Sequence, residues 1–293
     1  MSVEPTTKPA AAAGTVALGD LTVNRMGFGA MRLTGAGVWG EPPDRDGAKQ
    51  VLRRAVELGV NLIDTADAYG PDANEALIAE TLHPYTDGLV IATKGGLTRP
   101  GPGRWVRDCR PETLRSSLDG SLRRLRLDRI DLYQLHTVDP AVPLEESVGT
   151  LVALQEEGKI RHIGLSNVDA RELATARKVA SIVSVQNRYS VADRYSEGVV
   201  EVCEREGIAF LPWFPLALGE LATATGRLAD VARARGATCA QVALAWLLRR
   251  SPVMAPIPGT SSLEHLEEDI AAAEVELSDG EFAELSRSAE AVL

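Results

Sequence analysis

Four polar side chains in this sequence are placed where they could do chemistry together. Asp64, Lys94 and His136 each follow a short apolar run directly, and Tyr69 comes five residues after Asp64. Apolar runs of this length, separated by helix-like segments, indicate buried parallel strands, and the carboxyl ends of such strands border the crevice in which α/β proteins bind ligands. We therefore expect the four side chains to face one site.

These residue types suit proton transfer to an oxygen atom. Because a nearby ammonium favours a phenolate, Lys94 is expected to lower the pKa of Tyr69 and make its phenol a better proton donor to a developing alkoxide. Asp64 is placed to pair with Lys94 and keep it charged, and His136 could orient a carbonyl group or share the proton. Reduction of a carbonyl also needs a hydride, which no side chain supplies, so a cofactor is required.

Other chemistries fit these residues less well. A metal site built from Asp64, Asp67 and His136 lacks the usual cluster of ligands around an open position, and Lys94 would repel a cation, so no metal is expected. Nucleophilic catalysis lacks both a Gly-x-Ser-x-Gly turn and a cysteine at a strand end. An isomerase or lyase with a Schiff base on Lys94 would need an unpaired amine, whereas Asp64 is placed to keep it charged.

The composition predicts a soluble protein without a nucleic acid or membrane partner. Lys and Arg number 31 against 41 Asp and Glu, and the net charge of −10 opposes binding to a phosphate backbone. No apolar stretch approaches the roughly 20 residues of a membrane span. The 3 cysteines form no metal-ligand pair and the amino terminus has no signal-peptide pattern, so a cytoplasmic location is expected. Nothing marks an interface, so a monomer is the default.

Eight apolar runs alternate with helix-like segments, which fits a single (β/α)8 TIM barrel of the α/β class better than two doubly wound domains. The runs span residues 25–28, 60–63, 89–93, 130–135, 160–165, 182–185, 208–211 and 253–257. Residues 14–23 are expected to form an N-terminal β-hairpin that turns at Gly19 and Asp20. Residues 1–13 are predicted to be a flexible tail, residues 14–293 one barrel domain, and residues 278–293 an extra C-terminal helix.

The second half of the predicted barrel is suited to holding a cofactor. Ser166, Asn167 and Gln186 offer hydroxyl and amide groups for a carboxamide, and Trp213 offers a stacking face. Residues 258–262 join the last apolar run to a helix amino terminus, where backbone amides can bind an anion. The fingerprints of the Rossmann fold and of the P-loop are both missing from the sequence.

From about residue 14 to its carboxyl terminus, the sequence resembles the aldo/keto reductase family. The segments that carry the resemblance are residues 27–31, 64–70, 74–75, 93–94, 136, 164–167, 186–187, 213–216 and 257–260. The resemblance implies a (β/α)8 barrel that binds NADPH without a Rossmann domain and reduces aldehydes or ketones to alcohols.

By position, the resemblance implies that Tyr69 is the general acid, that Lys94 and Asp64 tune it, and that His136 orients the substrate. The residues that it implies for the cofactor are Gly29, Ala30, Met31, Asp64, Ser166, Asn167, Gln186, Trp213, Phe214, Pro215, Leu216, Gly219, Ile257, Gly259, Thr260, Ser261, His265, Glu268 and Asp269. In the segment that matches the adenosine-phosphate site, His265 stands where an Arg is common and Asp269 replaces an Asn. NADPH is therefore expected, with NADH as an alternative.

The substrate pocket is expected to have aromatic walls. Its predicted residues are Trp39, Tyr69, Trp105, His136 and Phe214, which suit a small aromatic aldehyde. Residues 29–40 also look similar to the bacterial branch of the family that includes pyridoxal reductases, so pyridoxal is a candidate substrate.

A cofactor-binding, redox-sensing regulatory subunit with little turnover is the alternative function. Channel-associated proteins that resemble this family keep the same four residues, so the residues alone leave both functions open.

Overall fold

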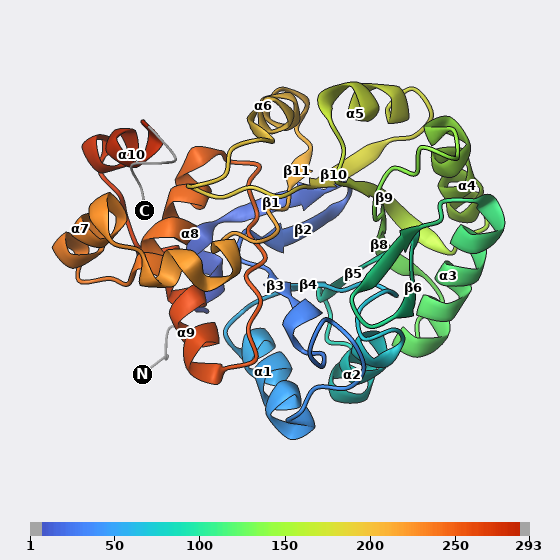
Figure 1. The fold of residues 1–293 in the computed structure, drawn as a ribbon, viewed down its shortest axis with the longest axis horizontal. Helices are drawn as coiled ribbons and strands as arrows, with labels where there is room; N and C mark the ends of the chain where they lie inside the picture. The colour runs from blue at the N-terminus through green and yellow to red at the C-terminus, as the bar shows by residue number, and fades with distance from the viewer. Residues whose placement is uncertain (1–7, 288–293) are drawn as a thin grey trace, which may run out of the picture.

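The computed structural model describes residues 8–287, without the side chain of Leu218. Figure 1 shows a ring of strands with helices around its outside. The strands are β1 (Thr15–Leu18), β2 (Leu21–Asn24), β3 (Phe28–Gly29), β4 (Leu62–Asp64), β5 (Val90–Gly95), β6 (Leu97–Gly101), β7 (Arg104–Arg107), β8 (Ile130–Leu135), β9 (Ile160–Ser166), β10 (Ile182–Gln186) and β11 (Ala209–Phe210).

Helices follow most of the barrel strands. The α-helices are α1 (Arg45–Glu57), α2 (Ala73–Leu82), α3 (Pro111–Leu125), α4 (Leu144–Glu156), α5 (Ala170–Ala176), α6 (Glu197–Glu206), α7 (Gly226–Arg235), α8 (Cys239–Arg250), α9 (Leu263–Ala271) and α10 (Asp279–Ser286). Short 310 helices are η1 (Pro9–Ala13), η2 (Ala30–Arg32), η3 (Ala217–Thr223) and η4 (Ala272–Glu274).

The central sheet runs in the order β11-β10-β9-β8-β5-β4-β3, and its neighbouring strands are parallel. Parallel neighbours require crossovers, and the helices provide them on the outer face of the sheet. This order follows the chain, as a (β/α)8 barrel requires.

The eighth predicted strand, residues 253–257, closes the ring by a few backbone hydrogen bonds. On one side Phe210 N donates to Val253 O and Ala255 N to Phe210 O, both at 2.8 Å. On the other side Gly27 N donates to Pro256 O at 3.0 Å. Pro256 in this segment lacks an N–H, which limits the ladder that can form. The barrel prediction is confirmed, with an irregular eighth strand.

The barrel interior is apolar and is covered at its amino-terminal end by the β1–β2 hairpin. Val16, Leu18 and Val23 of the hairpin pack with residues such as Leu62 and Leu132 that point into the barrel. The hairpin turn is tied down by Arg161, which donates to Asp20 at 2.7 Å. The predicted hairpin is therefore confirmed, and it leaves the carboxyl end of the strands as the open mouth.

The outer core lies between the strands and the helices. Helix α1 illustrates the local logic, because the Asp44 side chain accepts a hydrogen bond from Gly47 N and caps its first turn. Its buried residues Ala48, Val51, Leu52 and Ala55 recur every three or four positions, which places them on the face toward the barrel.

Two predicted segments differ from the structure. Residues 9–13 form η1, and Ala10 is fully buried against the core, so the predicted flexible tail is wrong for this stretch. Ala10 and the partly buried Ala13 pack against the core where the sequence composition suggested mobility. Helix α10 ends at Ser286, and the remainder of the predicted C-terminal helix, like residues 1–7, lies outside the described residues.

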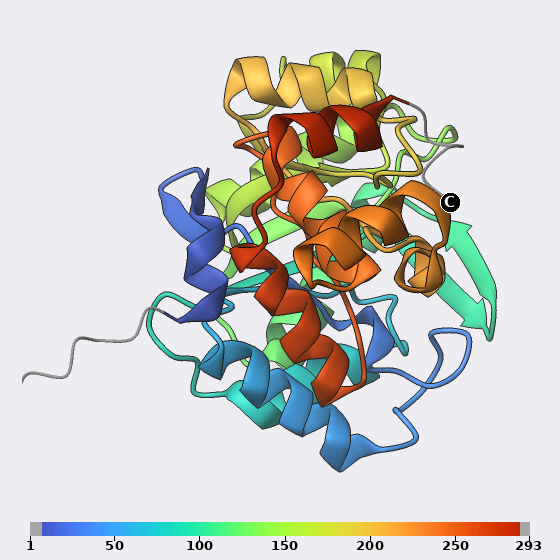
Figure 2. The same cartoon turned by 90° about the vertical axis from the view of Figure 1, so that its left-hand side faces the viewer.

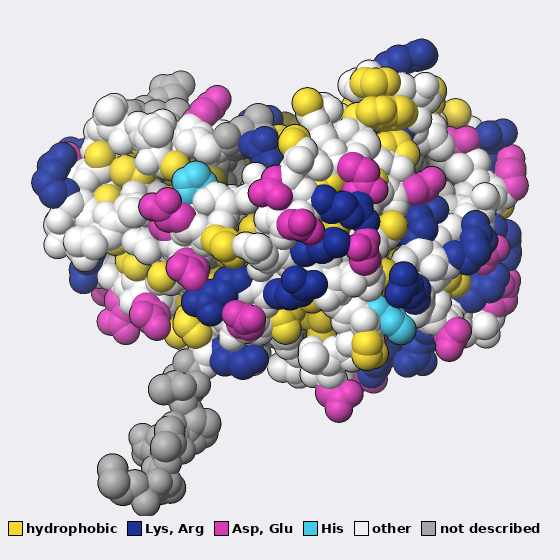
Figure 3. Space-filling model, turned by 90° about the horizontal axis from the view of Figure 1, so that it is seen from below, with side chains coloured by type: hydrophobic (Ala, Val, Ile, Leu, Met, Phe, Trp, Pro, Cys, Tyr) yellow, Lys and Arg dark blue, Asp and Glu magenta, His cyan; other side chains and the backbone are white. Residues whose placement is uncertain are grey.

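The surface carries both signs of charge. The face in Figure 3 mixes acidic with basic side chains. Among the described residues, no helix has the length and apolar character needed to cross a membrane.

Arg25, which lies between β2 and β3, joins the start of the barrel to its last segment. Its guanidinium donates to Met254 O at 2.9 Å and also to the carbonyls of Leu248, Ser251 and Ala13. Each bond satisfies a carbonyl at a helix end or in the irregular closing segment, where the backbone offers few partners.

We predict that Arg25→Met lowers the free energy of unfolding by about 2–4 kcal/mol, because the carbonyls lose a charged donor at similar side-chain volume. Urea unfolding followed by circular dichroism measures this loss. The control is Arg53→Met on the exposed face of α1, which should shift the midpoint far less. Equal shifts for both variants would contradict a closing role for Arg25.

Candidate active site

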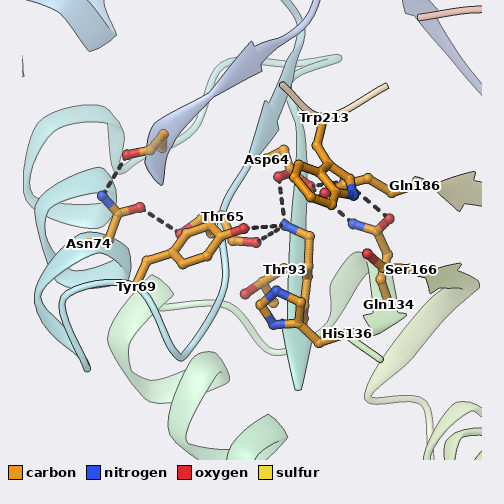
Figure 4. A network of polar contacts seen from close by, with 12 residues as sticks. Asp64, Thr65, Tyr69, Asn74, Thr93, Gln134, His136, Ser166, Gln186 and Trp213 are labelled. Atoms are coloured by element: carbon orange, nitrogen blue, oxygen red, sulfur yellow. Dashed lines mark hydrogen bonds and ion pairs between the residues drawn. The ribbon is translucent and has the colours of Figure 1, made fainter. Parts of the chain in front are cut away.

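The four sequence-predicted polar residues meet at the open mouth of the barrel, where Lys94 contacts Asp64 and Tyr69, and the Tyr69 ring lies beside that of His136. Figure 4 shows Asp64, Tyr69 and His136 in this cluster. Asp64 is the last residue of β4, Lys94 lies one residue from the end of β5, and His136 directly follows β8. Tyr69 lies in the loop between β4 and α2, and its N–H donates to Ala66 O at 3.1 Å. The carboxyl ends of neighbouring strands therefore bring residues up to 72 positions apart into one cluster.

Lys94 is the centre of this cluster. Its Nζ donates to Asp64 Oδ2 at 2.6 Å, to Thr65 O at 2.8 Å and to Tyr69 Oη at 3.3 Å, so its three donors are all used. The Lys94 side chain has no exposed surface. Burial lowers the pKa of Lys94, but Asp64 and Tyr69 outweigh it and the pKa is raised. The ammonium is therefore charged although it is buried.

The pKa of Tyr69 is raised, which corrects the prediction that Lys94 lowers it. Burial of the phenol is the largest cause, and the Asp64 carboxylate opposes the effect of the Lys94 ammonium. The sequence placed the cation correctly but could not show how far the phenol is removed from water. At neutral pH the phenol keeps its proton and can donate it.

His136 lies beside the phenol and is uncharged. Its ring is edge-on to that of Tyr69, with 5.7 Å between the centroids. Burial, together with the Lys94 charge, holds the pKa of His136 well below its usual range. Its Nδ1 atom is buried and lacks a hydrogen-bond partner among residues 8–287. A neutral imidazole can bind an oxygen atom without adding a second cation to the site.

Two glutamines hold the second oxygen of Asp64. Gln134 Nε2 donates to Asp64 Oδ1 at 3.0 Å and Gln186 Nε2 donates to it at 2.8 Å. Gln186 was predicted for the cofactor carboxamide, but its amide nitrogen is engaged by Asp64. Gln134 was missed by the sequence analysis. The available signal was a polar residue within an apolar strand. Gln134 lies two residues after Leu132, so its side chain is on the same face of the strand and points into the barrel.

Helix α2 supports the cluster from behind. Asn74 accepts from Thr65 Oγ1 at 2.7 Å and donates to Ala30 O at 2.9 Å. Glu75 accepts from Thr93 Oγ1 at 2.6 Å and from Arg124 Nε at 2.7 Å. The residues adjacent to Asp64 and Lys94 are thus anchored by fully buried polar groups, which fixes the two strand ends relative to each other.

A cavity of ≈ 650 Å³ opens from Tyr69 and His136 toward the amino terminus of α9. The predicted residues that line it are Gly29, Met31, Asp64, Tyr69, Trp105, His136, Ser166, Asn167, Gln186, Trp213, Phe214, Pro215, Leu216, Gly219, Ile257, Gly259, Thr260, Ser261, His265, Glu268 and Asp269. The sequence analysis missed Arg32, Ala222, Thr223 and Ala240, which also line it, as does Pro258 of the predicted anion-binding loop.

Three predicted residues lie outside this lining. Lys94 is covered by the groups that it contacts. Ala30 is fully buried, with its carbonyl turned to Asn74, so the prediction that it contacts the cofactor is not supported by its position. Trp39, predicted for the substrate pocket, lies beside Arg99 instead, with 5.6 Å between the guanidinium carbon and the ring centroid.

The middle of the cavity is an ordered set of amides and one aromatic ring. Asn167 has a positive φ of 58° and donates to His136 O and to Ser166 Oγ, both at 3.0 Å. Its side-chain oxygen accepts from Trp213 Nε1 at 3.1 Å. The indole is therefore fixed in place while one of its faces stays open to the cavity, as stacking on a flat ring requires.

The far end of the cavity lies at the start of α9. The Ser262 side chain caps this helix by accepting from His265 N. Ser261 and His265 are exposed here, whereas Asp269 is buried. Burial, with a smaller effect of Glu268, raises the pKa of Asp269 to about 7. A helix amino terminus attracts anions, but an ionised Asp269 would oppose one.

Comparison with known proteins agrees with this geometry. Residues 25–290 match the aldo/keto reductase family. The chain is 49% identical over 276 residues to an uncharacterized oxidoreductase of Schizosaccharomyces pombe, with 94% of this chain and 90% of that one covered. It is 45% identical over 271 residues to pyridoxine 4-dehydrogenase of Escherichia coli, with 90% and 94% covered.

A solved structure shares the fold. The aldo-keto reductase from Klebsiella pneumoniae in complex with NADPH matches with a TM-score of 0.79 at 28% identity, covering 93% of this chain and 94% of that one. The barrel and its mouth define an enzyme that acts on small molecules. The chain belongs to the aldo/keto reductase family and is an oxidoreductase.

Asp67, in the loop between β4 and α2, lies outside the cavity that contains Asp64 and Tyr69. It lines a second cavity of ≈ 540 Å³ beside α3, and its Oδ1 is buried without a hydrogen-bond partner among residues 8–287. Burial, with the nearby Glu75 carboxylate, raises the pKa of Asp67 to about 7. The folded protein therefore binds a proton here that the unfolded chain has already lost above its ordinary pKa of 3.8.

This difference predicts that stability falls as pH rises from about 4 to about 7 and that the loss is complete above about 7. Asp67→Asn removes the ionisation, so it should gain about 1–3 kcal/mol relative to wild type between about pH 5 and about pH 8. Thermal unfolding at both pH values measures the change. Asp87→Asn, at an exposed site in the loop between α2 and β5, should show no such pH dependence. A gain in Asp67→Asn that does not depend on pH would contradict burial of the carboxyl in the folded state.

Proposed function

We propose that this protein is an NADPH-dependent carbonyl reductase in which Tyr69 is the general acid. The observation that carries the proposal is the buried Lys94 ammonium, which contacts both the Asp64 carboxylate and the Tyr69 phenol at the mouth of a cavity. A protonated phenol beside a permanent cation is suited to give its proton to a carbonyl oxygen and to be stabilised as phenolate afterwards.

The residues of the cavity fit NADPH. Trp213 presents a ring face for the nicotinamide, and Ser166 and Asn167 lie beside it with polar atoms for the carboxamide. Gly259 approaches Gly29 so closely that a Cβ at Gly259 would lie 2.4 Å from Gly29 O, so the absence of a side chain lets the two backbones pack together where both line the cavity. The helix end at Ser262 suits a phosphate. The related enzyme solved with NADPH supports this assignment.

The bound cofactor supplies the hydride, and the side chains handle the proton and the charge. Tyr69 donates its proton to the carbonyl oxygen of the substrate. Lys94 stabilises the phenolate that remains, since its Nζ lies 3.3 Å from the phenol oxygen. Neutral His136 holds the same carbonyl oxygen in place, and Asp64 keeps Lys94 charged through the 2.6 Å ion pair. In the reverse direction the phenolate accepts the proton of an alcohol.

We propose a small aromatic aldehyde, with pyridoxal as the first candidate, as the substrate. The cavity wall near Tyr69 includes Trp105, Trp213 and Phe214, so a flat ring would meet aromatic surface on entry. The 45% identity to the pyridoxine 4-dehydrogenase of Escherichia coli supports the same ring chemistry.

We predict that Tyr69→Phe lowers turnover of pyridoxal and 4-nitrobenzaldehyde by about 10²–10⁴-fold, because the proton donor is removed while the ring remains. Consumption of NADPH measures turnover, and titration of tryptophan fluorescence should give an unchanged affinity for NADPH. Tyr195→Phe is the matched control, since Tyr195 is 96% exposed and should leave activity intact. Full activity in Tyr69→Phe would overturn the role of this residue.

The same measurement separates the enzyme from the regulatory alternative. A wild-type protein that binds NADPH tightly but turns over neither aldehyde would favour the redox-sensing subunit over the general reductase.

The buried Asp269 predicts a pH effect on cofactor affinity. The carboxyl is neutral below about pH 7 and anionic above it, and an anion at this end of the cavity repels the adenosine phosphate of NADPH. Asp269→Asn should therefore match wild type at about pH 6 and bind NADPH about three- to tenfold more tightly at about pH 8. Titration of NADPH and NADH at both pH values measures this.

The effect on NADH should be smaller, because NADH lacks the 2′-phosphate. Glu264→Gln on the exposed face of α9 is the control and should leave both affinities unchanged. An equal gain for NADPH and NADH in Asp269→Asn would show that Asp269 does not face that phosphate.

A further inference from the structure

The β6–β7 hairpin stands outside the barrel and borders the mouth. It follows β5 after a single residue, and among residues 8–287 its two strands pair only with each other, as an antiparallel ribbon. Figure 2 shows it projecting from the body of the molecule. All residues of β7 are exposed, including Trp105 at 40% and Val106 at 44%. A two-stranded ribbon with so little burial is only marginally stable, so something else must hold it.

Arg99 of β6 supplies that restraint. Its Nη1 donates to Val38 O at 2.9 Å and to Ala68 O at 3.0 Å. Its Nη2 donates to Gly37 O at 3.0 Å, and its Nε donates across the hairpin to Arg104 O at 3.1 Å. One guanidinium thus joins the loop after η2, the loop after β4 and the hairpin itself.

These bonds reach the reacting groups through two short routes. Ala68 directly precedes Tyr69, so the bond to Ala68 O fixes the backbone from which the phenol projects. On its other side the guanidinium stacks on Trp105, with 3.7 Å between its carbon and the ring centroid. The Trp105 ring is in turn edge-on to both Tyr69 and His136, at 6.5 Å between centroids in each case.

The partners of Arg99 indicate a positioning role. Its hydrogen-bond acceptors are backbone carbonyls, and among residues 8–287 no carboxylate forms an ion pair with it. A planar fork of donors with a stacking face suits several fixed carbonyls and a ring at once, whereas a lysine ammonium cannot satisfy this geometry. Arg99 therefore links three segments of the mouth, namely residues 37–38, Ala68 and the hairpin.

We propose that Arg99 is a specificity-determining positioning residue, which clamps the hairpin and the loops after β3 and β4 so that Trp105 forms a fixed wall beside Tyr69 and His136. A fixed aromatic wall favours a flat ring on the carbonyl over a short alkyl chain that does not reach it. The proposal rests on the proposed reductase function for its kinetic consequence but not for the clamp itself.

The kinetic test compares an aromatic with a short aliphatic aldehyde. Arg99→Lys should raise KM for 4-nitrobenzaldehyde and pyridoxal by about five- to tenfold, the size of one lost aromatic contact, and change KM for propanal less than about twofold. The affinity for NADPH should be retained. Arg104→Lys, the same change at an exposed position of the same hairpin, is the matched control and should alter neither KM.

A double-variant cycle tests whether Arg99 acts through Trp105. Trp105→Ala should give the same aromatic-selective rise in KM, and Arg99→Lys should add little to it. The specificity role would be overturned if the rises in KM of the two single variants multiplied in the double variant. It would also be overturned if KM rose equally for propanal and the aromatic aldehydes.

A readout without turnover keeps the clamp testable on its own. In hydrogen exchange, Arg99→Lys should speed exchange of residues 97–107 about tenfold or more and leave the β8 and β9 amides unchanged, and Arg104→Lys should not. Unchanged exchange of the hairpin in Arg99→Lys refutes the clamp whatever the kinetics show. If wild type reduces no aldehyde while Arg99→Lys does loosen the hairpin, the reductase function fails and the clamp stands.

Discussion

The buried ion pair between Asp64 and Lys94 is the interaction on which the site depends. Moving two opposite charges out of water is unfavourable unless every remaining polar atom finds a partner. Here Lys94 also contacts Thr65 O and Tyr69 Oη, and Gln134 and Gln186 complete Asp64. The partners come from different strands, so the pair requires a closed ring of parallel strands around it. The site therefore forms only when the strands of the barrel have come together.

Burial and the buried ion pair together determine the protonation state of each group in the mouth. Burial alone would favour the neutral form of every group in the mouth. Asp64 reverses this for Lys94, whereas His136 stays neutral because Lys94 adds to the effect of burial. Tyr69 keeps its proton because burial and the Asp64 carboxylate outweigh the opposing effect of the Lys94 ammonium on its pKa. The three groups at the mouth of the cavity are consequently a cation, a neutral ring and a protonated phenol.

The sequence predicted what depends on the order of residues along one strand. Asp64, Lys94 and His136 could be found because the end of an apolar run is visible in the chain and strand ends converge in a parallel barrel. What depends on contacts between distant segments could not be found. Gln134 lies within an apolar run, and the sequence does not show that it contacts Asp64. The acceptors of Arg99 are backbone carbonyls of distant residues, which no sequence pattern reveals. The wrong direction for the pKa of Tyr69 has the same origin, because burial is a property of the folded state.

The contacts of Arg25 carry a consequence for synthesis on the ribosome. Its carbonyl partners Leu248, Ser251 and Met254 lie 223 to 229 residues further along the chain. Since β3 also finds its outer neighbour only in residues 253–258, the nascent chain exposes an unpaired strand edge until about nine tenths of it has been made. An edge of this kind is a template for wrong pairing. The growing barrel therefore keeps an open edge for most of its translation.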